Sequence, residues 1–274
     1  MPATLVLVSM TGCAATISTP DPDVFTAPPR DAITFWGHAC CYIDLGGFGI
    51  VTDPVFNSWT VGRNRKVGSP PAASYAAARI ILLSHAHDDH LSAKTIATFP
   101  ESTLVLCPEP AMSHAAAAGR PVRVMKLGDV HEFSGGRIHA VAAHHPGSRR
   151  GIDAEDDGRA LGYVIESAYG AIYYSGDTDL FAGFAEVAAR FAPRILILNV
   201  NGHLKGEDAV DAARVSGAEI VVPAHHGVYG FWFWGPRRRP RDAELLERSL
   251  GPTLHVLDVG ASLPLRVAAT PAAP

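Results

Sequence analysis

The sequence contains no apolar run of the roughly 20 residues that a membrane-spanning helix needs. Cysteine is scarce as well, because only four occur among 274 residues and two of these, Cys40 and Cys41, are neighbours. Such a set cannot form the dense disulfide framework of a small secreted scaffold. These absences argue against an integral helical membrane protein and against a disulfide-stabilised miniature domain.

Charge is limited too. Charged residues make up 18% of the chain, and the formal net charge is −4. A dedicated nucleic-acid binder needs a basic face to neutralise phosphates, so no nucleic-acid partner is expected. The Gly-x-Ser-x-Gly motif of serine esterases is absent. With 47% hydrophobic residues, the chain is a folded protein with a sizeable core.

The N-terminal residues have the pattern of a targeting segment. Residues 3–10 form a short apolar stretch, and Thr11 and Gly12 precede Cys13. This resembles the bacterial lipoprotein signal, in which the cysteine is lipidated. Residues 18–30 are Pro-rich and suit a tether. We expect a leader and tether over residues 1–30 and an envelope lipoprotein anchored through Cys13 rather than a cytoplasmic protein; the alternative is a buried strand over residues 3–10.

From residue 31 onward, short β-branched runs come first as hairpins and later alternate with helical patterns. This order is typical of mixed sheets whose outer faces are covered by helices, here in one domain over residues 31–274. The predicted helices are 180–191, 207–216 and 242–250. The predicted strands are 33–36, 40–45, 48–52, 80–83, 104–107, 122–126, 138–142, 162–166, 171–174, 195–199, 220–223 and 254–257.

Histidine is abundant, with 13 residues, and it is the commonest metal ligand among side chains. The densest cluster is residues 84–90 (SHAHDDH), directly after an apolar strand. In an extended turn His85 and His87 point to the same side, while Asp89 and His90 reach towards a second position. A lone histidine is usually a core residue, but four ligand-type side chains within six residues are costly to desolvate without a metal. The segment therefore predicts a metal site.

Further candidate ligands follow other predicted strands. The pair His144 and His145 follows strand 138–142, and Asp177 follows strand 171–174 after a glycine. His225 and His226 follow strand 220–223. A Gly-Asp pair alone indicates only a turn, so the weight of Asp177 comes from the whole set.

In their chain order, these motifs resemble the metallo-β-lactamase superfamily. The resemblance implies an α/β fold, an αββα sandwich of two mixed β-sheets flanked by helices, with a binuclear metal site along one edge. Residues 33–39 (ITFWGHA), 52–54, 203–210 and 257–262 are similar to the N-acyl-phosphatidylethanolamine phospholipase D-like and ascorbate-6-phosphate lactonase-like branch.

The resemblance implies a role for each matching residue. The first metal would be held by His85, His87 and one of the adjacent pair His144 and His145. His145 is preferred because Ala143 and Arg149 fit the branch pattern around it, although Ala142 replaces a proline. The second metal would be held by Asp89, His90 and His225, with Asp177 bridging. Asp53 would orient a ligand by hydrogen bonding, and the surroundings or the substrate would be contacted by His38, His144, His203 and His226. For His38 and His203 the alternative is a purely structural role.

The chemistry implied is hydrolysis of an ester, lactone or phosphodiester by a hydroxide bridging two divalent ions. Imidazole and carboxylate ligands suit Zn²⁺ best and also admit Mn²⁺ or Fe²⁺. Asp89 would orient the hydroxide, and the leaving group would be protonated by metal-bound water or by His203. The alternatives are a non-catalytic envelope binding protein stabilised by metal, or a nuclease of the same fold.

An aromatic run over residues 231–234 leads directly into the arginine-rich residues 236–241. Together with Trp59, these could form a lip that seats acyl chains and anionic head groups. We therefore expect a small-molecule or lipid-like substrate and contact with a membrane surface. The alternative is that the aromatic side chains fill the core while the arginines are solvated.

Overall fold

The computed structural model describes residues 24–57, 59–60, 63–145, 159–200, 204–230 and 242–265, and in residues 59–60, 63–64 and 230 only the backbone. The predictions for Cys13, His203, the Trp59 side chain and residues 231–241 concern parts of the chain outside this description. No helix in the described ranges is long and apolar enough to cross a membrane.

The first sheet has seven strands and combines an antiparallel half with a parallel half. The hairpins of the N-terminal region supply the antiparallel half, and β3, β6, β7 and β8 run parallel. Its order is β16 (Ser262–Pro264), β1 (Ala32–Gly37), β2 (Cys40–Leu45), β3 (Phe48–Thr52), β6 (Ala78–Leu82), β7 (Leu104–Cys107) and β8 (Val122–Val124).

The second sheet has six strands and is also mixed. Strands β9 to β12 are antiparallel neighbours, whereas β12, β13 and β14 run parallel. Its order is β14 (Ile220–Ala224), β13 (Ile195–Asn199), β12 (Gly170–Tyr174), β11 (Leu161–Ser167), β10 (Gly136–Ala142) and β9 (Val130–Phe133). A small third sheet contains β15 (Tyr229–Gly230), β5 (Arg63–Arg65) and β4 (Trp59–Thr60).

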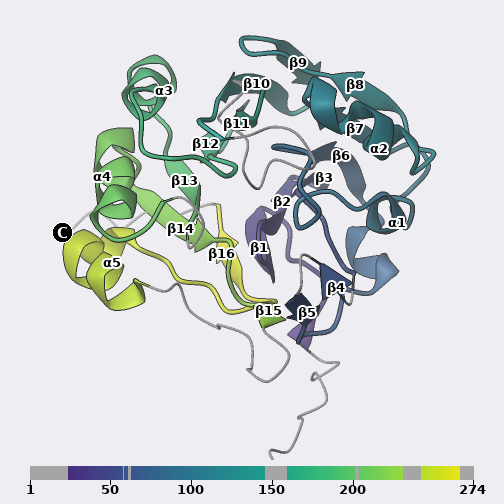
Figure 1. The fold of residues 1–274 in the computed structure, drawn as a ribbon, viewed down its shortest axis with the longest axis horizontal. Helices are drawn as coiled ribbons and strands as arrows, with labels where there is room; N and C mark the ends of the chain where they lie inside the picture. Colours follow the sequence, from purple (N-terminus) through teal and green to yellow (C-terminus); the bar gives the residue numbers. More distant parts are fainter. Residues whose placement is uncertain are drawn as a thin grey trace, which may run out of the picture.

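Helices cover the two outer faces of this sandwich (Figure 1). The first sheet is flanked by α1 (Ala93–Ile96) and α2 (Met112–Ala116), and the second by α3 (Gly183–Phe191), α4 (Glu207–Ser216) and α5 (Ala243–Leu250). Short 3-10 turns lie at Ala72–Tyr75, Glu109–Ala111 and Gly251–Thr253. The predicted αββα sandwich of two mixed sheets flanked by helices is confirmed.

The core forms layers because successive residues of a strand point to opposite faces. In β6, Ile80 and Leu82 lie in the core between the sheets, while Ile81 belongs to the outer core under α1 and α2. In β13, Ile195 faces the inner core and Leu196 packs with α3 and α4. Strands covered on both faces explain why their sequences are nearly continuous apolar runs.

Several predicted boundaries are wrong, among them the starts of β6 at Ala78 and of β10 at Gly136. The strand expected over 254–257 is reduced to one bridge between Leu254 and Val221, with the His255 N–H donating to Val221. The next bond of a parallel ladder would need an N–H at position 223, which is a proline. The helix expected from residue 180 begins at Gly183, and the strand expected to reach residue 126 ends at Val124.

The packed region also begins before the predicted boundary at residue 31. Phe25 is buried in the outer core of the first sheet, beside Trp36 and Tyr42. Part of the segment expected to be a tether is therefore part of the folded domain.

Candidate metal centre

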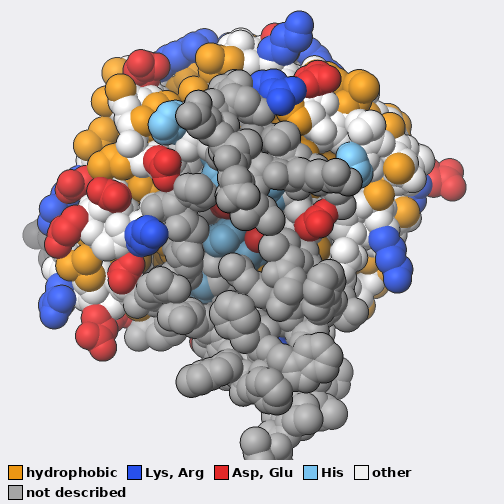
Figure 2. Space-filling model, in the orientation of Figure 1, with side chains coloured by type: hydrophobic (Ala, Val, Ile, Leu, Met, Phe, Trp, Pro, Cys, Tyr) orange, Lys and Arg blue, Asp and Glu red, His pale blue; other side chains and the backbone are white. Residues whose placement is uncertain are grey.

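The candidate ligands gather at one edge of the sandwich because the chain leaves its strands there. Asp53 follows β3, residues 84–90 follow β6, and His145, Asp177 and His225 follow β10, β12 and β14. In open α/β sheets, binding sites form beyond the carboxyl ends of the strands. Figure 2 shows histidine and acidic side chains near the centre of one face of the molecule.

The first cluster consists of His85, His87 and His145, each offering a ring nitrogen within 4.8 Å of the others. The Nδ1 of His87 lies 2.8 Å from Nε2 of His85 and 3.2 Å from Nε2 of His145. Burial lowers the pKa of His85 well below its ordinary value. Neutral imidazole is the form that binds metal ions, so the cluster has the chemistry of a three-histidine site.

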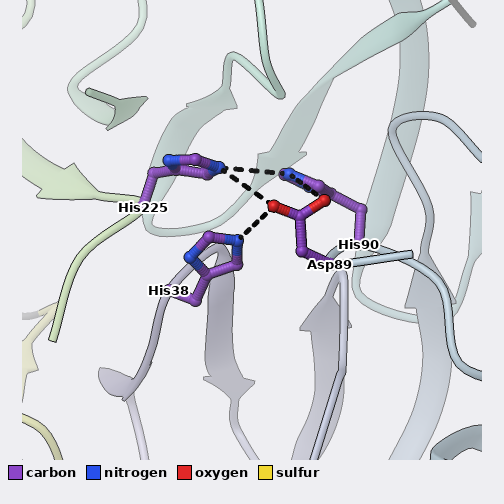
Figure 3. Close-up of side chains that lie close together, drawn as sticks. All are labelled: His38, Asp89, His90 and His225. Carbon is purple, nitrogen blue, oxygen red and sulfur yellow. Dashed lines mark hydrogen bonds and ion pairs between the residues drawn. The ribbon is translucent and has the colours of Figure 1, made fainter. Parts of the chain in front are cut away.

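The second cluster consists of His38, Asp89, His90 and His225 (Figure 3). His38 Nε2 is 3.2 Å from Asp89 Oδ2, and His90 Nε2 is 3.3 Å from His225 Nε2. The His38 ring also lies over His225, with 4.0 Å between centroids. One carboxylate and three imidazoles therefore converge at the second cluster.

Asp177 lies beside two residues of the second cluster, His90 and His225. Its Oδ2 lies 3.2 Å from Nε2 of His90 and 3.4 Å from Nε2 of His225. The two clusters are adjacent, because the rings of His85 and His90 are 4.2 Å apart. The turn that carries Asp177 packs closely against Ser84. Glycine is needed at position 176 of this turn, because its φ is +60° and a Cβ there would lie 2.7 Å from Cβ of Ser84.

Asp53 lies behind His90. Its Oδ2 accepts hydrogen bonds from His90 Nδ1 at 2.7 Å, from the Ser84 hydroxyl at 2.6 Å and from the Tyr174 hydroxyl at 2.5 Å. Its Oδ1 accepts from the Ser84 backbone N–H at 2.8 Å. Carboxylates in this position fix the tautomer and orientation of a ligand histidine.

The buried charges of the site influence each other strongly. Burial alone would lower the pKa of His90, but Asp177 and Asp89 raise it well above its ordinary value. Burial would raise the pKa of Asp177, yet His225 and His90 hold it well below its ordinary range. Burial and the nearby His225 lower the pKa of His38 to about 3. His38 is therefore neutral and the Asp177 carboxylate ionised, whereas the surrounding carboxylates favour the protonated form of His90, whose positive charge a bound cation would replace.

The backbone is strained at several of these residues. Among the described non-glycine residues, a positive φ occurs at His38, Asp53 and His225, and elsewhere at Asp31 and Ala192. Strained conformations persist where the surrounding structure holds them, and they cluster at functional sites. Here the His38 N–H donates to the His226 carbonyl at 2.5 Å, and the His225 N–H donates to the His38 carbonyl at 2.6 Å. These bonds join the β1–β2 turn to the loop after β14.

Two of the remaining candidates lie away from the clusters. His144 is half exposed, 3.9 Å from the Asp179 carboxylate and with its ring near Phe181. His145, rather than His144, therefore lies in the first cluster. His226 is buried, with Nε2 3.0 Å from the Pro223 carbonyl and its ring 4.7 Å from that of Phe35. This position gives His226 packing contacts, and its contact with substrate stays a prediction.

Sequence reasoning assigned no role to Ser84, Tyr174 or Asn199, which the structure brings into the site. Asn199 Nδ2 lies 3.0 Å from Oδ1 of Asp177 and 3.3 Å from the Tyr174 hydroxyl. The available signal was a polar residue at the end of an otherwise apolar strand, residues 195–199. The other residues of the site follow strands in the same way.

Comparisons with known proteins identify the family of the chain. The family described as "Beta-lactamase superfamily domain" matches residues 49–226. A UPF0173 metal-dependent hydrolase of Myxococcus xanthus is 30% identical over 243 residues, which cover 80% of this chain and 81% of the relative. Another, from Flavobacterium johnsoniae, is 31% identical over 206 residues, covering 73% of this chain and 86% of the relative.

Solved structures share the fold. An isothiocyanate hydrolase from Delia radicum gut bacteria has a TM-score of 0.66 and 23% identity, covering 85% of this chain and 98% of its own. A possible metal-dependent hydrolase from Veillonella parvula has a TM-score of 0.67 and 16% identity, covering 86% and 100%. Both structural matches speak for the fold alone. From the family match and the curated relatives, the chain belongs to the β-lactamase superfamily and is a metal-dependent hydrolase of the metallo-β-lactamase fold.

Proposed function

We propose that the chain is a binuclear hydrolase, in which each cluster holds one divalent ion and Asp177 contacts both. The observation that carries this proposal is the adjacency of the clusters: the ring centroid of His85, in the first cluster, lies 4.2 Å from that of His90, in the second. Beside His90, Asp89 and His225 belong to the second cluster, and Asp177 lies within 3.4 Å of both His90 and His225. Two ions sharing one substrate can stabilise both the attacking and the leaving oxygen of a displacement.

The donor set fits divalent ions. Nδ1 of His87 has two imidazole nitrogens within 3.2 Å, and a single ring proton can serve only one of these contacts. A cation between the rings would satisfy the three facing nitrogens, His87 Nδ1, His85 Nε2 and His145 Nε2, at once. Imidazole and carboxylate donors without thiolate suit Zn²⁺, Mn²⁺ or Fe²⁺.

The bound ions would supply an activated water molecule and would polarise the substrate's oxygen. The chain's own residues hold this machinery in place. Asp53 accepts from His90 and so fixes that ring, while His38 holds Oδ2 of Asp89. Asp89 is the more accessible of the buried carboxylates, with 16% of its side chain exposed against 9% for Asp177. It is therefore placed to orient the water against a substrate.

For the substrate, we propose an ester, lactone or phosphodiester of a lipid-like molecule. This proposal rests on the motif resemblance to the phospholipase D-like and lactonase-like branch and on the aromatic and arginine-rich residues 231–241. These residues come directly after β15 and only a few positions after His225. The formal net charge of −4 makes a nuclease the weaker alternative.

Two measurements on the full chain test the proposal. Metal analysis after expression with added Zn²⁺, Mn²⁺ or Fe²⁺ should find about two ions per chain. A panel of phosphodiesters, lactones and acyl esters should then show metal-dependent turnover of one class, and an isothiocyanate joins the panel because a structural relative is named for that reaction. Absence of bound metal would overturn the proposal, and bound metal without turnover of any panel member would favour the binding-protein alternative.

We further propose that Cys13 anchors the protein to a bacterial membrane. The support is the apolar stretch 3–10 followed by Thr11, Gly12 and Cys13. Expression of wild type and Cys13→Ser in a bacterium, followed by fractionation, tests this. The wild type should be found with membranes and Cys13→Ser in the soluble fraction, and identical distributions would contradict the proposal.

A further inference from the structure

Side chains of the site close a continuous ring of hydrogen bonds and ion pairs. Asp177 Oδ2 is 3.2 Å from His90 Nε2, and His90 Nδ1 is 2.7 Å from Asp53 Oδ2. The same Asp53 oxygen accepts from the Tyr174 hydroxyl, which lies 3.3 Å from Asn199 Nδ2. Asn199 Nδ2 returns to Oδ1 of Asp177 at 3.0 Å. Asn199 is the one neutral amide in this ring.

The direction of each bond follows from the donors. The Tyr174 hydroxyl gives its proton to the Asp53 carboxylate and must therefore accept from Asn199. Both hydrogens of the Asn199 amide are then used, one on Tyr174 and one on Asp177. The flipped amide would place its oxygen against the Asp177 carboxylate, so this orientation is fixed.

Burying Asn199 in this orientation has a free-energy cost. It is 3% exposed, and its Oδ1 is a buried atom without a hydrogen-bond partner among the described residues. A buried polar atom without a partner needs an explanation, and function is one. The Asn199 backbone N–H also donates to the Ser175 hydroxyl at 3.1 Å, and that hydroxyl donates to the Gly176 carbonyl. Asn199 thus contacts both the side chain of Asp177 and the turn that carries it.

We propose that Asn199 is a positioning residue that fixes the Asp177 carboxylate. By occupying Oδ1, Asn199 leaves Oδ2, the oxygen that faces His90 and His225, as the one available to the metal ions. The inference rests on the proposed metal site. It predicts that a change at Asn199 alters metal binding even though Asn199 contacts no ion itself.

Titration of the metal-free full chain with Co²⁺ tests the inference, because the visible spectrum of Co²⁺ reports its ligands and geometry. Asn199→Leu keeps the approximate volume and removes both donors. We expect at least one Co²⁺ to bind about 10- to 100-fold more weakly, as outer partners of metal ligands typically require, and the Co²⁺ spectrum to change.

The matched control is Thr103→Val, which removes another buried hydrogen bond, to the Ala78 carbonyl, away from the site. It should lower the melting temperature while leaving the Co²⁺ affinity and spectrum unchanged. Should Asn199→Leu fail to fold, Asn199→Ser carries the test, because its short hydroxyl cannot span to Asp177.

The possible results separate the inference from the proposed function. A wild type that binds no Co²⁺ overturns the proposed metal site and the inference with it. A wild type that binds Co²⁺, together with a folded Asn199 variant of identical affinity and spectrum, overturns the inference alone. Equal changes in the Asn199 variant and in Thr103→Val would also overturn it, because the effect would then be general destabilisation.

Discussion

Nδ1 of His90 lies 2.7 Å from Oδ2 of Asp53, and both side chains are fully buried. The contact leaves Nε2 of His90 as the nitrogen that faces Asp177. Replacing Asp53 by Asn removes the charge that fixes this tautomer and leaves one fewer acceptor for Ser84 and Tyr174. We expect Asp53→Asn to lower metal affinity or turnover by about 10- to 100-fold, measured by metal titration and by rates at saturating metal.

Asp44→Asn is the control for that change. Asp44 is also buried, but its Oδ1 accepts backbone N–H bonds from Asp31 and Gly47 in a turn away from the site. This variant should lose stability and keep wild-type metal affinity. Equal metal affinity in Asp53→Asn and wild type would refute the role assigned to Asp53.

The adjacent histidines after β10 provide a second test. His145 is buried with Nε2 3.2 Å from His87, whereas the side chain of His144 is 51% exposed. His145→Ala should remove a ligand and cost more activity than the roughly 10- to 100-fold typical of an outer partner. His144→Ala should keep two bound ions and can alter only the KM. Metal loss in His144→Ala with full occupancy in His145→Ala would reverse the assignment.

Much of the site was predictable because its residues are local in the sequence. Residues 84–90 carry four candidate ligands after one strand, and each other candidate follows a strand of its own. A polar residue directly after a buried strand is conspicuous, and parallel strands bring their ends to one edge. The expectation that His85, His87 and His90 lie together at one edge of the sandwich needed only this rule, whereas their division between two metals came from the family resemblance.

The outer contacts were not predictable, because they depend on which strands are neighbours. Tyr174 reaches Asn199 only because β12 and β13 pair in parallel, with Tyr174 opposite Ile197. The sequence alone presents Tyr174 as one more aromatic core residue. Short elements such as α1 and β9, each four residues long, also span too few residues for a hydrophobic period to be recognised.

Metal removal is expected to lower the melting temperature. The site buries Asp53, Asp177 and several imidazoles together, and ions that bind only the folded chain stabilise it by mass action. At a free metal concentration about 100 times Kd, the gain is about 2.7 kcal/mol, or roughly 5–10 °C for a domain of this size. Calorimetry with EDTA and with excess Zn²⁺ measures the difference. An identical melting temperature in both conditions would argue against a metal bound in the fold.

The described cysteines should be unreactive in the folded protein. Burial raises the pKa of Cys41 and of Cys107 from 9.0 to about 12 and that of Cys40 well above its ordinary value. Because the thiolate is the nucleophile, a rise of that size leaves roughly 1000-fold less of it at pH 8. In a Cys13→Ser background, a thiol reagent should react with three groups only after unfolding in guanidinium. Fast reaction of the native protein would contradict the burial of these side chains.

Two neighbouring tyrosines on β12 allow a direct comparison of a hydroxyl that is hydrogen-bonded in the site with one that is not. Tyr174 donates to Asp53 and accepts from Asn199, whereas the buried hydroxyl of Tyr173 has no hydrogen-bond partner among the described residues. Tyr174→Phe removes one hydrogen-bond partner from the Asp53 carboxylate and one from the Asn199 amide, and it should lower the free energy of unfolding by about 1–3 kcal/mol.

Tyr173→Phe removes a hydroxyl that bonds to nothing in the described part of the chain, so it should leave the free energy of unfolding unchanged or raise it. Urea unfolding of both variants in the presence of EDTA measures these values without a metal contribution. Since both changes delete one oxygen from fully buried rings on the same strand, loss of packing cannot account for a difference between them. Equal unfolding free energies would mean that the hydrogen-bond network through Tyr174 adds no stability without metal. The role of the Tyr174 hydroxyl would then lie only in holding Asp53 for His90.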